Sequence, residues 1–137
     1  FGGIPIQRID AEGTKKLMHQ LKDAGVNYID TARGYTVSEE YLGYALEGIR
    51  KDFVIATKSM ARTKEGMAQD IDISLKNLRT DYIDLYQIHN IKTDADFERR
   101  RGYMLQQWAK DISVQNNVTK ILADYTGDLQ IPKTIHY

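Results

Sequence analysis

The stretch GVNYIDTARGYTVSEEYLGYAL, residues 25–46, decides the fold because it joins a strand pattern directly to a helix pattern. Residues 26–30 (VNYID) are β-branched and aromatic, which is the composition of a buried strand. After a polar loop, Leu42, Ala45, Leu46 and Ile49 recur at the spacing of one helix face. The stretch therefore predicts a strand, a loop and a helix in that order.

Two further strand patterns follow at regular intervals. Residues 53–58 (FVIATK) and 82–89 (YIDLYQIH) have the same composition, and the three strands end at Asp30, Lys58 and His89. These intervals match the roughly 30 residues of one βαβ unit, and residues 1–4 fit the end of an earlier strand. We therefore predict parallel strands with crossover helices, either in a doubly wound sheet or in a (β/α)8 barrel. The chain has no G-x-G-x-x-G turn, the usual fingerprint of the doubly wound dinucleotide fold.

A helix pattern precedes each of the three strands. We expect Thr14, Ser38 and Thr63 to cap these helices, because a hydroxyl at the first position accepts a backbone N–H. Gly25 is expected to end the first helix in the left-handed conformation, and Glu39 and Glu40 to favour the positive end of the second. The predicted buried positions of the first and third helices are Leu17, Leu21, Ala24, Met67, Ile71, Leu75 and Leu78.

Composition narrows the class of protein. The 137 residues carry 19 basic and 19 acidic side chains with no cysteine, which argues against thiolate metal sites, disulfides and strong attraction to nucleic acid or anionic membranes. The sequence shows neither a spanning apolar run of about 18 residues nor a signal peptide. His19 and His136 have no second ligand at metal spacing, so we expect no metal site. We expect a cytoplasmic protein with a small-molecule partner and leave its oligomeric state open.

Four residues that can move or steer a proton come at the strand ends: Asp30, Tyr35, Lys58 and His89. The carboxyl ends of parallel strands meet at one edge, so these side chains are expected to form one cluster. Each taken alone is more often an ordinary surface or core group, and only their coincidence favours catalysis. A cation such as Lys58, paired with Asp30, would favour the tyrosinate form of Tyr35. His89 would then donate to a carbonyl oxygen or share the proton path.

A resemblance to a known family is carried by three ordered blocks, residues 25–46, 53–58 and 74–89 (SLKNLRTDYIDLYQIH), and by FGGIPI at residues 1–6. The chain resembles the aldo-keto reductase family over about residues 1–95. The resemblance implies a (β/α)8 barrel, NADPH or NADH as cofactor, and hydride transfer to an aldehyde or ketone. It implies a catalytic tetrad of Asp30, Tyr35, Lys58 and His89, with Tyr35 as general acid. Tyr35 and His89 would contact the substrate, and Gly2, Gly3 and Asp30 would border the nicotinamide ribose.

The chain is close to half of the roughly 250 residues of a whole barrel. We therefore expect residues 1–95 to form the first units of the barrel and the cofactor site to be incomplete on the phosphate side. Residues 96–137 show two helical patterns, which we expect either to belong to later barrel helices or to cap the exposed edge. Two other functions stay open: a catalytically incomplete half barrel, and a non-enzymatic nucleotide-sensing subunit.

Overall fold

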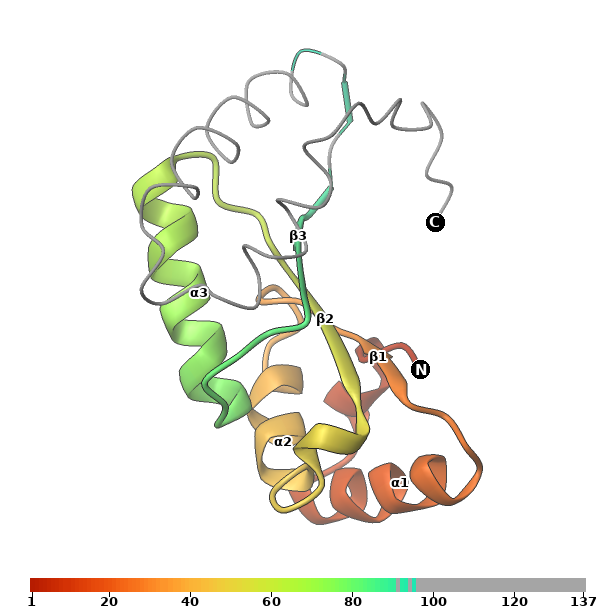
Figure 1. Ribbon diagram of the computed structural model, residues 1–137. Helices are drawn as coiled ribbons and strands as arrows, with labels where there is room; N and C mark the ends of the chain where they lie inside the picture. Colours follow the sequence, from red (N-terminus) through yellow and green to blue (C-terminus); the bar gives the residue numbers. More distant parts are fainter. Residues whose placement is uncertain (91, 94, 96–137) are drawn as a thin grey trace, which may run out of the picture.

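A computed structural model describes residues 1–90, 92, 93 and 95, and a parallel sheet forms the centre of this part (Figure 1). The strands are β1 (Tyr28–Asp30), β2 (Val54–Ser59) and β3 (Leu85–Ile88), in the order β1-β2-β3. Both pairs are parallel, as the alternation of helix and strand predicts. The start of the chain continues the sheet, because Gly2 forms a parallel bridge with Asp30.

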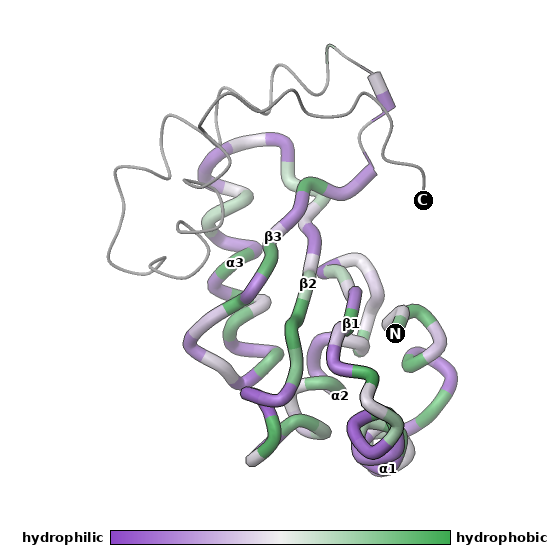
Figure 2. Tube along the Cα trace, turned by 45° about the vertical axis from the view of Figure 1, so that its right-hand side comes forward, coloured by the Kyte–Doolittle hydropathy of each residue, from purple (hydrophilic) through white to green (hydrophobic). Residues whose placement is uncertain are grey.

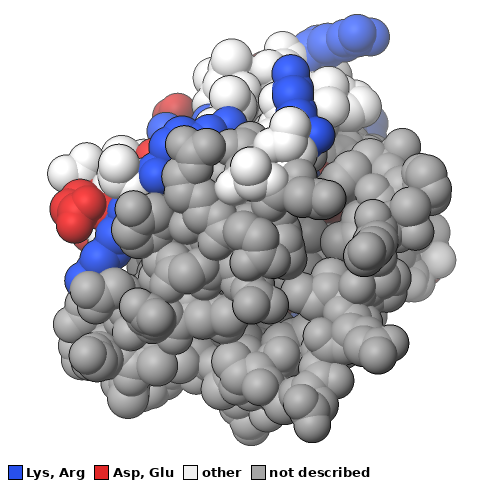
Figure 3. All heavy atoms as spheres, turned by 90° about the horizontal axis from the view of Figure 1, so that it is seen from above, with Lys and Arg blue, Asp and Glu red and all other residues white. Residues whose placement is uncertain are grey.

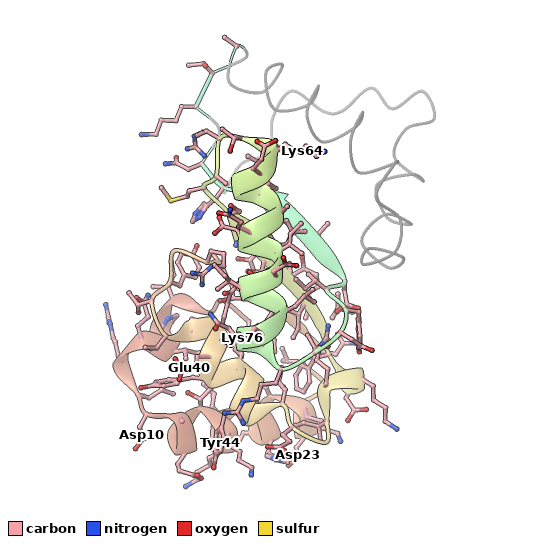
Figure 4. All side chains as sticks on the ribbon, turned by 90° about the vertical axis from the view of Figure 1, so that its left-hand side faces the viewer. Asp10, Asp23, Glu40, Tyr44, Lys64 and Lys76 are labelled. Atoms are coloured by element: carbon pink, nitrogen blue, oxygen red, sulfur yellow. The ribbon has the colours of Figure 1, made fainter. Side chains whose placement is uncertain are left out.

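The helices follow one another along the sheet, as Figure 1 shows. They are α1 (Ala11–Asp23), α2 (Ser38–Ala45) and α3 (Lys64–Leu78), with short 3-10 turns η1 (Ile4–Arg8) and η2 (Arg50–Asp52). The first helix packs on the second and the second on the third, while α3 also covers β2. In Figure 4, Asp10 and Asp23 mark the two ends of α1, and Lys64 and Lys76 lie near the two ends of α3. Connections of this kind produce the βα units of a barrel wall.

The core lies between the sheet and these helices. Figure 2 shows β2 hydrophobic over its first half and more polar toward its carboxyl end. Each fully buried aliphatic side chain contributes about 1.5–3 kcal/mol of transfer free energy, so this layer supplies most of the stabilisation. The fully or nearly fully buried apolar residues include Ile6, Met18, Ile29, Leu42, Leu46, Ile55, Ile71, Leu78 and Ile83.

Close packing of α2 on α3 depends on one glycine. A Cβ atom at Gly43 would lie 2.1 Å from the carbonyl oxygen of Asn77 and 2.7 Å from the carbonyl carbon of Leu78. No side chain fits at such distances without moving backbone. Gly43 therefore sets the distance between the two helices.

One of the three predicted helix caps is confirmed and two are wrong. Thr63 accepts from the backbone N–H of Gly66 at 3.1 Å. The cap of α1 is instead Asp10, whose carboxylate accepts from Gly13 at 2.7 Å, while Thr14 lies inside the helix and donates back to the Asp10 carbonyl. Ser38 does not cap α2, since its hydroxyl donates to the Gly3 carbonyl at 3.0 Å.

The end of α1 agrees with prediction at Gly25 and differs at Ala24. Gly25 has φ +78°, the left-handed conformation expected for a residue that ends a helix. Ala24 is exposed, whereas Met18 is fully buried, because the buried stripe runs through Thr14 and Met18. The predicted stripe of α1 is therefore displaced by one position, with Leu17 and Leu21 at its partly buried margin.

The third strand begins later than predicted, at Leu85 rather than at Tyr82. The reason is the side chain of Asp84, which accepts from the backbone N–H of Ile55 at 2.8 Å and from Arg50 at 2.7 Å. A carboxylate thus replaces a ladder hydrogen bond at the amino end of β3. The two helices expected within residues 96–137 lie outside the described residues. Among the described residues, no helix is long and apolar enough to cross a membrane.

Candidate active site

The carboxyl ends of the strands bring the predicted residues to one edge of the sheet. Asp30 is the last residue of β1, Lys58 the penultimate residue of β2, and His89 follows β3. Backbone bonds hold the loops in register: Arg33 donates to the Lys58 carbonyl at 2.9 Å, and His89 to the Ser59 carbonyl at 2.8 Å. The loop that carries Tyr35 therefore continues across the end of β2.

The ammonium group of Lys58 is the buried centre of the cluster. Its side chain is 4% exposed, and it donates to a carboxylate oxygen of Asp30 and, at 2.8 Å, to the Thr31 carbonyl. The Asp30 side chain is 37% exposed, and one of its two carboxylate oxygens binds Lys58. The cation of this pair is therefore buried, whereas its anion is accessible to a hydroxyl group of a bound ligand.

The rings of Tyr35 and His89 complete the cluster. The Lys58 ammonium lies 5.4 Å from the centroid of the Tyr35 ring. That ring meets His89 edge to face, with centroids 5.6 Å apart and planes at 86°. The structure thus brings together Asp30 of β1, Lys58 of β2, and Tyr35 and His89, which follow β1 and β3.

Burial and the positive charge of Lys58 lower the pKa of His89 below its ordinary value. The charge of Arg62 acts in the same direction, and the carboxylate of Asp30 opposes both. At neutral pH the ring is therefore an uncharged imidazole, which donates through one nitrogen and accepts through the other. Such a group can donate a hydrogen bond to a carbonyl oxygen without adding a second cation beside Lys58.

The predicted glycines lie beside Asp30 at the start of the chain. Gly3 donates to the Asp30 carbonyl at 2.7 Å, and a Cβ there would lie 2.8 Å from the Ser38 hydroxyl and 2.9 Å from that of Thr31. Gly3 therefore has a packing reason to be a glycine. Gly2 is exposed, and apart from its two chain neighbours no atom of the described residues lies within 4 Å of the position its Cβ would take.

A second polar cluster lies between the sheet and the helices, and the sequence reasoning missed it. Glu39 is 1% exposed and accepts from Thr57, Ser74 and Arg33, rather than facing solvent at the start of α2. The available signal was the hydroxyl of Thr57, which directly follows the apolar residues at the start of the strand. A buried hydroxyl requires a partner, and the sequence alone does not say which.

Seen from above, the described residues show Lys and Arg side chains at several points, with Asp and Glu side chains on one side (Figure 3). In the part of the chain that the structure describes, no three His, Asp or Glu side chains are close enough to hold a metal ion.

Comparison with known proteins gives a consistent picture. A family model described as "Aldo/keto reductase family" matches residues 1–125. Aldo-keto reductase YhdN of Bacillus subtilis is 38% identical over 103 residues, which cover 65% of this chain and 31% of that protein.

Two solved structures share the fold. Aldo-keto reductase AKR11C1 of Bacillus halodurans, in its holo form, matches with a TM-score of 0.69 and 28% identity, covering 82% of this chain and 42% of that one. An aldo/keto reductase of Klebsiella pneumoniae in complex with NADP and acetate matches with a TM-score of 0.63 and 28% identity, covering 73% and 36%. These neighbours are (β/α)8 barrels, and the described strands and helices correspond to part of such a barrel. The chain spans about a third of the length of the curated relative and less than half of these structures.

Proposed function

The chain belongs to the aldo/keto reductase family, and we propose on that premise that it carries the acid–base centre of an NADPH-dependent oxidoreductase that reduces aldehydes or ketones to alcohols. The observation that carries the proposal is the burial of Lys58 between the Asp30 carboxylate and the Tyr35 ring. A buried cation next to a phenol favours the deprotonated phenol. Tyr35 is thereby suited to release a proton in the transition state.

The proposed reaction gives each residue of the cluster one task. Tyr35 donates the proton to the oxygen of the carbonyl as charge develops there. Lys58 stabilises the resulting phenolate, and Asp30 keeps Lys58 charged and oriented, since an unpaired ammonium in a closed site is costly. His89, uncharged and in edge contact with Tyr35, donates a hydrogen bond that orients the substrate carbonyl. Tyr35 and His89 are therefore the proposed substrate contacts.

The residues at the edge of β1 fit a nicotinamide nucleotide. The partly exposed Asp30 carboxylate has one oxygen available to accept from a ribose hydroxyl. Gly2 leaves space beside it that a side chain would fill. When bound, the cofactor supplies the hydride, and the protein contributes orientation and proton transfer. NADPH is favoured over NADH by the NADP complex of the Klebsiella relative.

Two measurements test the proposal. NADPH binding is followed by quenching of intrinsic fluorescence, and turnover of a simple aromatic aldehyde is followed at the NADPH absorbance band. We expect saturable binding and turnover, with Tyr35→Phe lowering kcat by about 10²–10⁴-fold and leaving NADPH affinity within about twofold. A Tyr35→Phe protein that reduces the aldehyde at the wild-type rate would refute Tyr35 as the proton donor.

The same pair of measurements separates the two other functions. A catalytically incomplete half barrel would bind no NADPH. A non-enzymatic nucleotide-sensing subunit would bind NADPH and reduce no aldehyde. Tyr41→Phe changes a tyrosine of α2 that is not one of the four cluster residues; it is the matched control and should leave turnover unchanged.

A further inference from the structure

We propose that the ion pair between Arg33 and Glu39 is a positioning device that holds the loop of Tyr35 in place over Lys58. The expected effect on kcat rests on the proposed reductase function, whereas the expected effect on the position of the loop rests on the geometry alone. Neither residue belongs to the cluster at the strand ends. Their effect on catalysis would therefore pass through Tyr35 and Lys58.

Glu39 is fixed from three sides. One carboxylate oxygen accepts from the Thr57 hydroxyl and the Ser74 hydroxyl, both at 2.7 Å. The other accepts from the Arg33 guanidinium at 2.9 Å. The carboxylate thus joins β2, α3 and the loop after β1 at a point that is 1% exposed. A charge-assisted hydrogen bond at such depth is strong and leaves the carboxylate little freedom to move.

Arg33 transmits this restraint to the loop. It is two residues from Tyr35, and its backbone N–H donates to the Lys58 carbonyl at 2.9 Å. Its guanidinium binds Glu39 and also lies 3.8 Å from a carboxylate oxygen of Asp70. Both the backbone and the side chain of Arg33 therefore form hydrogen bonds near the carboxyl end of β2.

The strand itself is held from the same side. Side chains alternate along β2, so Thr57 and Ser59 face the helices while Lys58 between them faces the opposite way. Thr57 donates to Glu39, and Ser59 donates to Asp70 on α3. Both neighbours of Lys58 are thus bound to the two carboxylates that surround Arg33. The separation between Lys58 and Tyr35 is set by one shared network.

The test separates positioning from stability by comparing one single with one double variant. Arg33→Met leaves the Glu39 carboxylate buried without its cation, which should lower Tm by about 10 °C. Adding Glu39→Gln removes that carboxylate charge and should restore Tm to within about 3 °C of wild type. If the pair only stabilises the fold, turnover recovers with Tm. If it positions Tyr35, the stable double variant keeps a kcat about 10–100-fold below wild type, with KM for the aldehyde within about twofold.

A second readout is independent of turnover. The chain has three histidines, so the imidazole NMR signals can be titrated and His89 assigned with His89→Gln. The double variant removes one positive and one negative charge, so its direct electrostatic effect on His89 is small. Movement of the Tyr35 ring away from His89 would admit water and raise the pKa of His89 toward its ordinary value.

One control variant and three possible outcomes decide whether the Arg33–Glu39 pair positions Tyr35. Glu40→Gln changes the neighbouring exposed carboxylate of α2 and should leave Tm, kcat and the His89 titration unchanged. A folded double variant with wild-type kcat and His89 titration overturns the inference while the reductase proposal stands. If the wild-type chain reduces no aldehyde, the proposed function fails, and the His89 titration alone decides the positioning role. If the double variant does not fold, Arg33→Lys decides, because it keeps the charge without the planar fork, and wild-type kcat in it overturns the inference.

Discussion

Two ion pairs on opposite sides of β2 show opposite patterns of exposure. In the pair at the strand ends, the Lys58 cation is 4% exposed and the Asp30 anion is 37% exposed. In the pair behind the strand, the Arg33 cation is 24% exposed and the Glu39 anion is 1% exposed. In the pair at the strand ends the buried partner is therefore the cation, whereas in the pair behind the strand it is the anion.

The difference separates a pair built to meet a ligand from a pair built to hold the chain. The buried ammonium of Lys58 acts on its neighbour Tyr35, and the exposed Asp30 carboxylate can accept a further hydrogen bond. Glu39 has both carboxylate oxygens satisfied by the protein and can accept nothing from outside. Removing a residue of the first pair should therefore harm turnover more than folding, whereas removing Arg33 should harm both.

The largest effect is expected for Lys58→Met. Without the ammonium, Tyr35 loses the charge that favours its phenolate, and kcat for aldehyde reduction should fall by about 10²–10⁴-fold. Folding should change little, since Asp30 is open to water and methionine fills the apolar part of the lysine site. Steady-state kinetics and thermal unfolding by circular dichroism measure the two effects. Lys76→Met, on the exposed side of α3, is the matched control (Figure 4).

That contrast would fail if Lys58→Met unfolded the protein, or if it left kcat unchanged. The first result would make Lys58 a structural residue like Glu39. The second would remove the acid–base role of the pair at the strand ends.

A large effect on stability is expected for Gly43→Ala. The new methyl group would meet the Asn77 carbonyl at 2.1 Å, so α2 must move away from α3. This separates Glu39 on α2 from Ser74 on α3 and should cost about 3 kcal/mol in the free energy of unfolding. Urea unfolding measures it. Gly34→Ala, whose Cβ would meet only the Met60 sulfur at 3.8 Å, should change the free energy of unfolding by less than about 1 kcal/mol.

An equal loss in both glycine variants would show that crowding between α2 and α3 is not the cause.

The order of elements and the gathering of the four strand-end residues could be predicted from the sequence. Parallel strands with regular spacing end on one edge, so Asp30, Lys58 and His89 had to meet wherever the helices packed. The cap at Thr63 could be predicted because the group it accepts from, the backbone N–H of Gly66, lies only three residues along the chain. These features could be predicted because a helix cap depends only on residues close in sequence, and the meeting of strand ends depends only on the order of the elements.

What the sequence could not predict depends on contacts between distant residues. Ser38 has the pattern of a helix cap, yet its hydroxyl binds Gly3, which is 35 residues away. Glu39 has the pattern of a solvated carboxylate at a helix start, yet its partners come from β2, α3 and the preceding loop. Thr57 and Ser59 share a side of β2, and the carboxylates that they bind, Glu39 and Asp70, come from α2 and α3.

A smaller effect is expected from the titration of His89. Burial and the charges of Lys58 and Arg62 lower the pKa of His89 in the folded protein. Between the unfolded value of about 6.5 and the lowered folded value, the unfolded chain binds more protons. Stability should therefore be complete above about pH 6.5 and decrease as the pH falls through that window.

Urea unfolding of wild type and His89→Gln at pH 7.5 and 5.5 measures the contribution of this histidine. The decrease on acidification should be smaller in the variant. An identical decrease in both proteins would mean that His89 is solvated, and that the cluster at the strand ends is open rather than closed around Lys58.

The smallest effect is expected for a third ion pair, between Glu47 and Arg79. Its atoms are 3.9 Å apart, and the side chains are 72% and 53% exposed. Water solvates both charges whether or not they are paired, so Glu47→Gln should change the free energy of unfolding by about 0.5 kcal/mol or less, by urea unfolding. Each of the other two pairs has one buried side chain, whereas both side chains of this pair are exposed. A loss from Glu47→Gln as large as that from Arg33→Met would mean that ion pairing itself, and not the closing of one partner, governs stability.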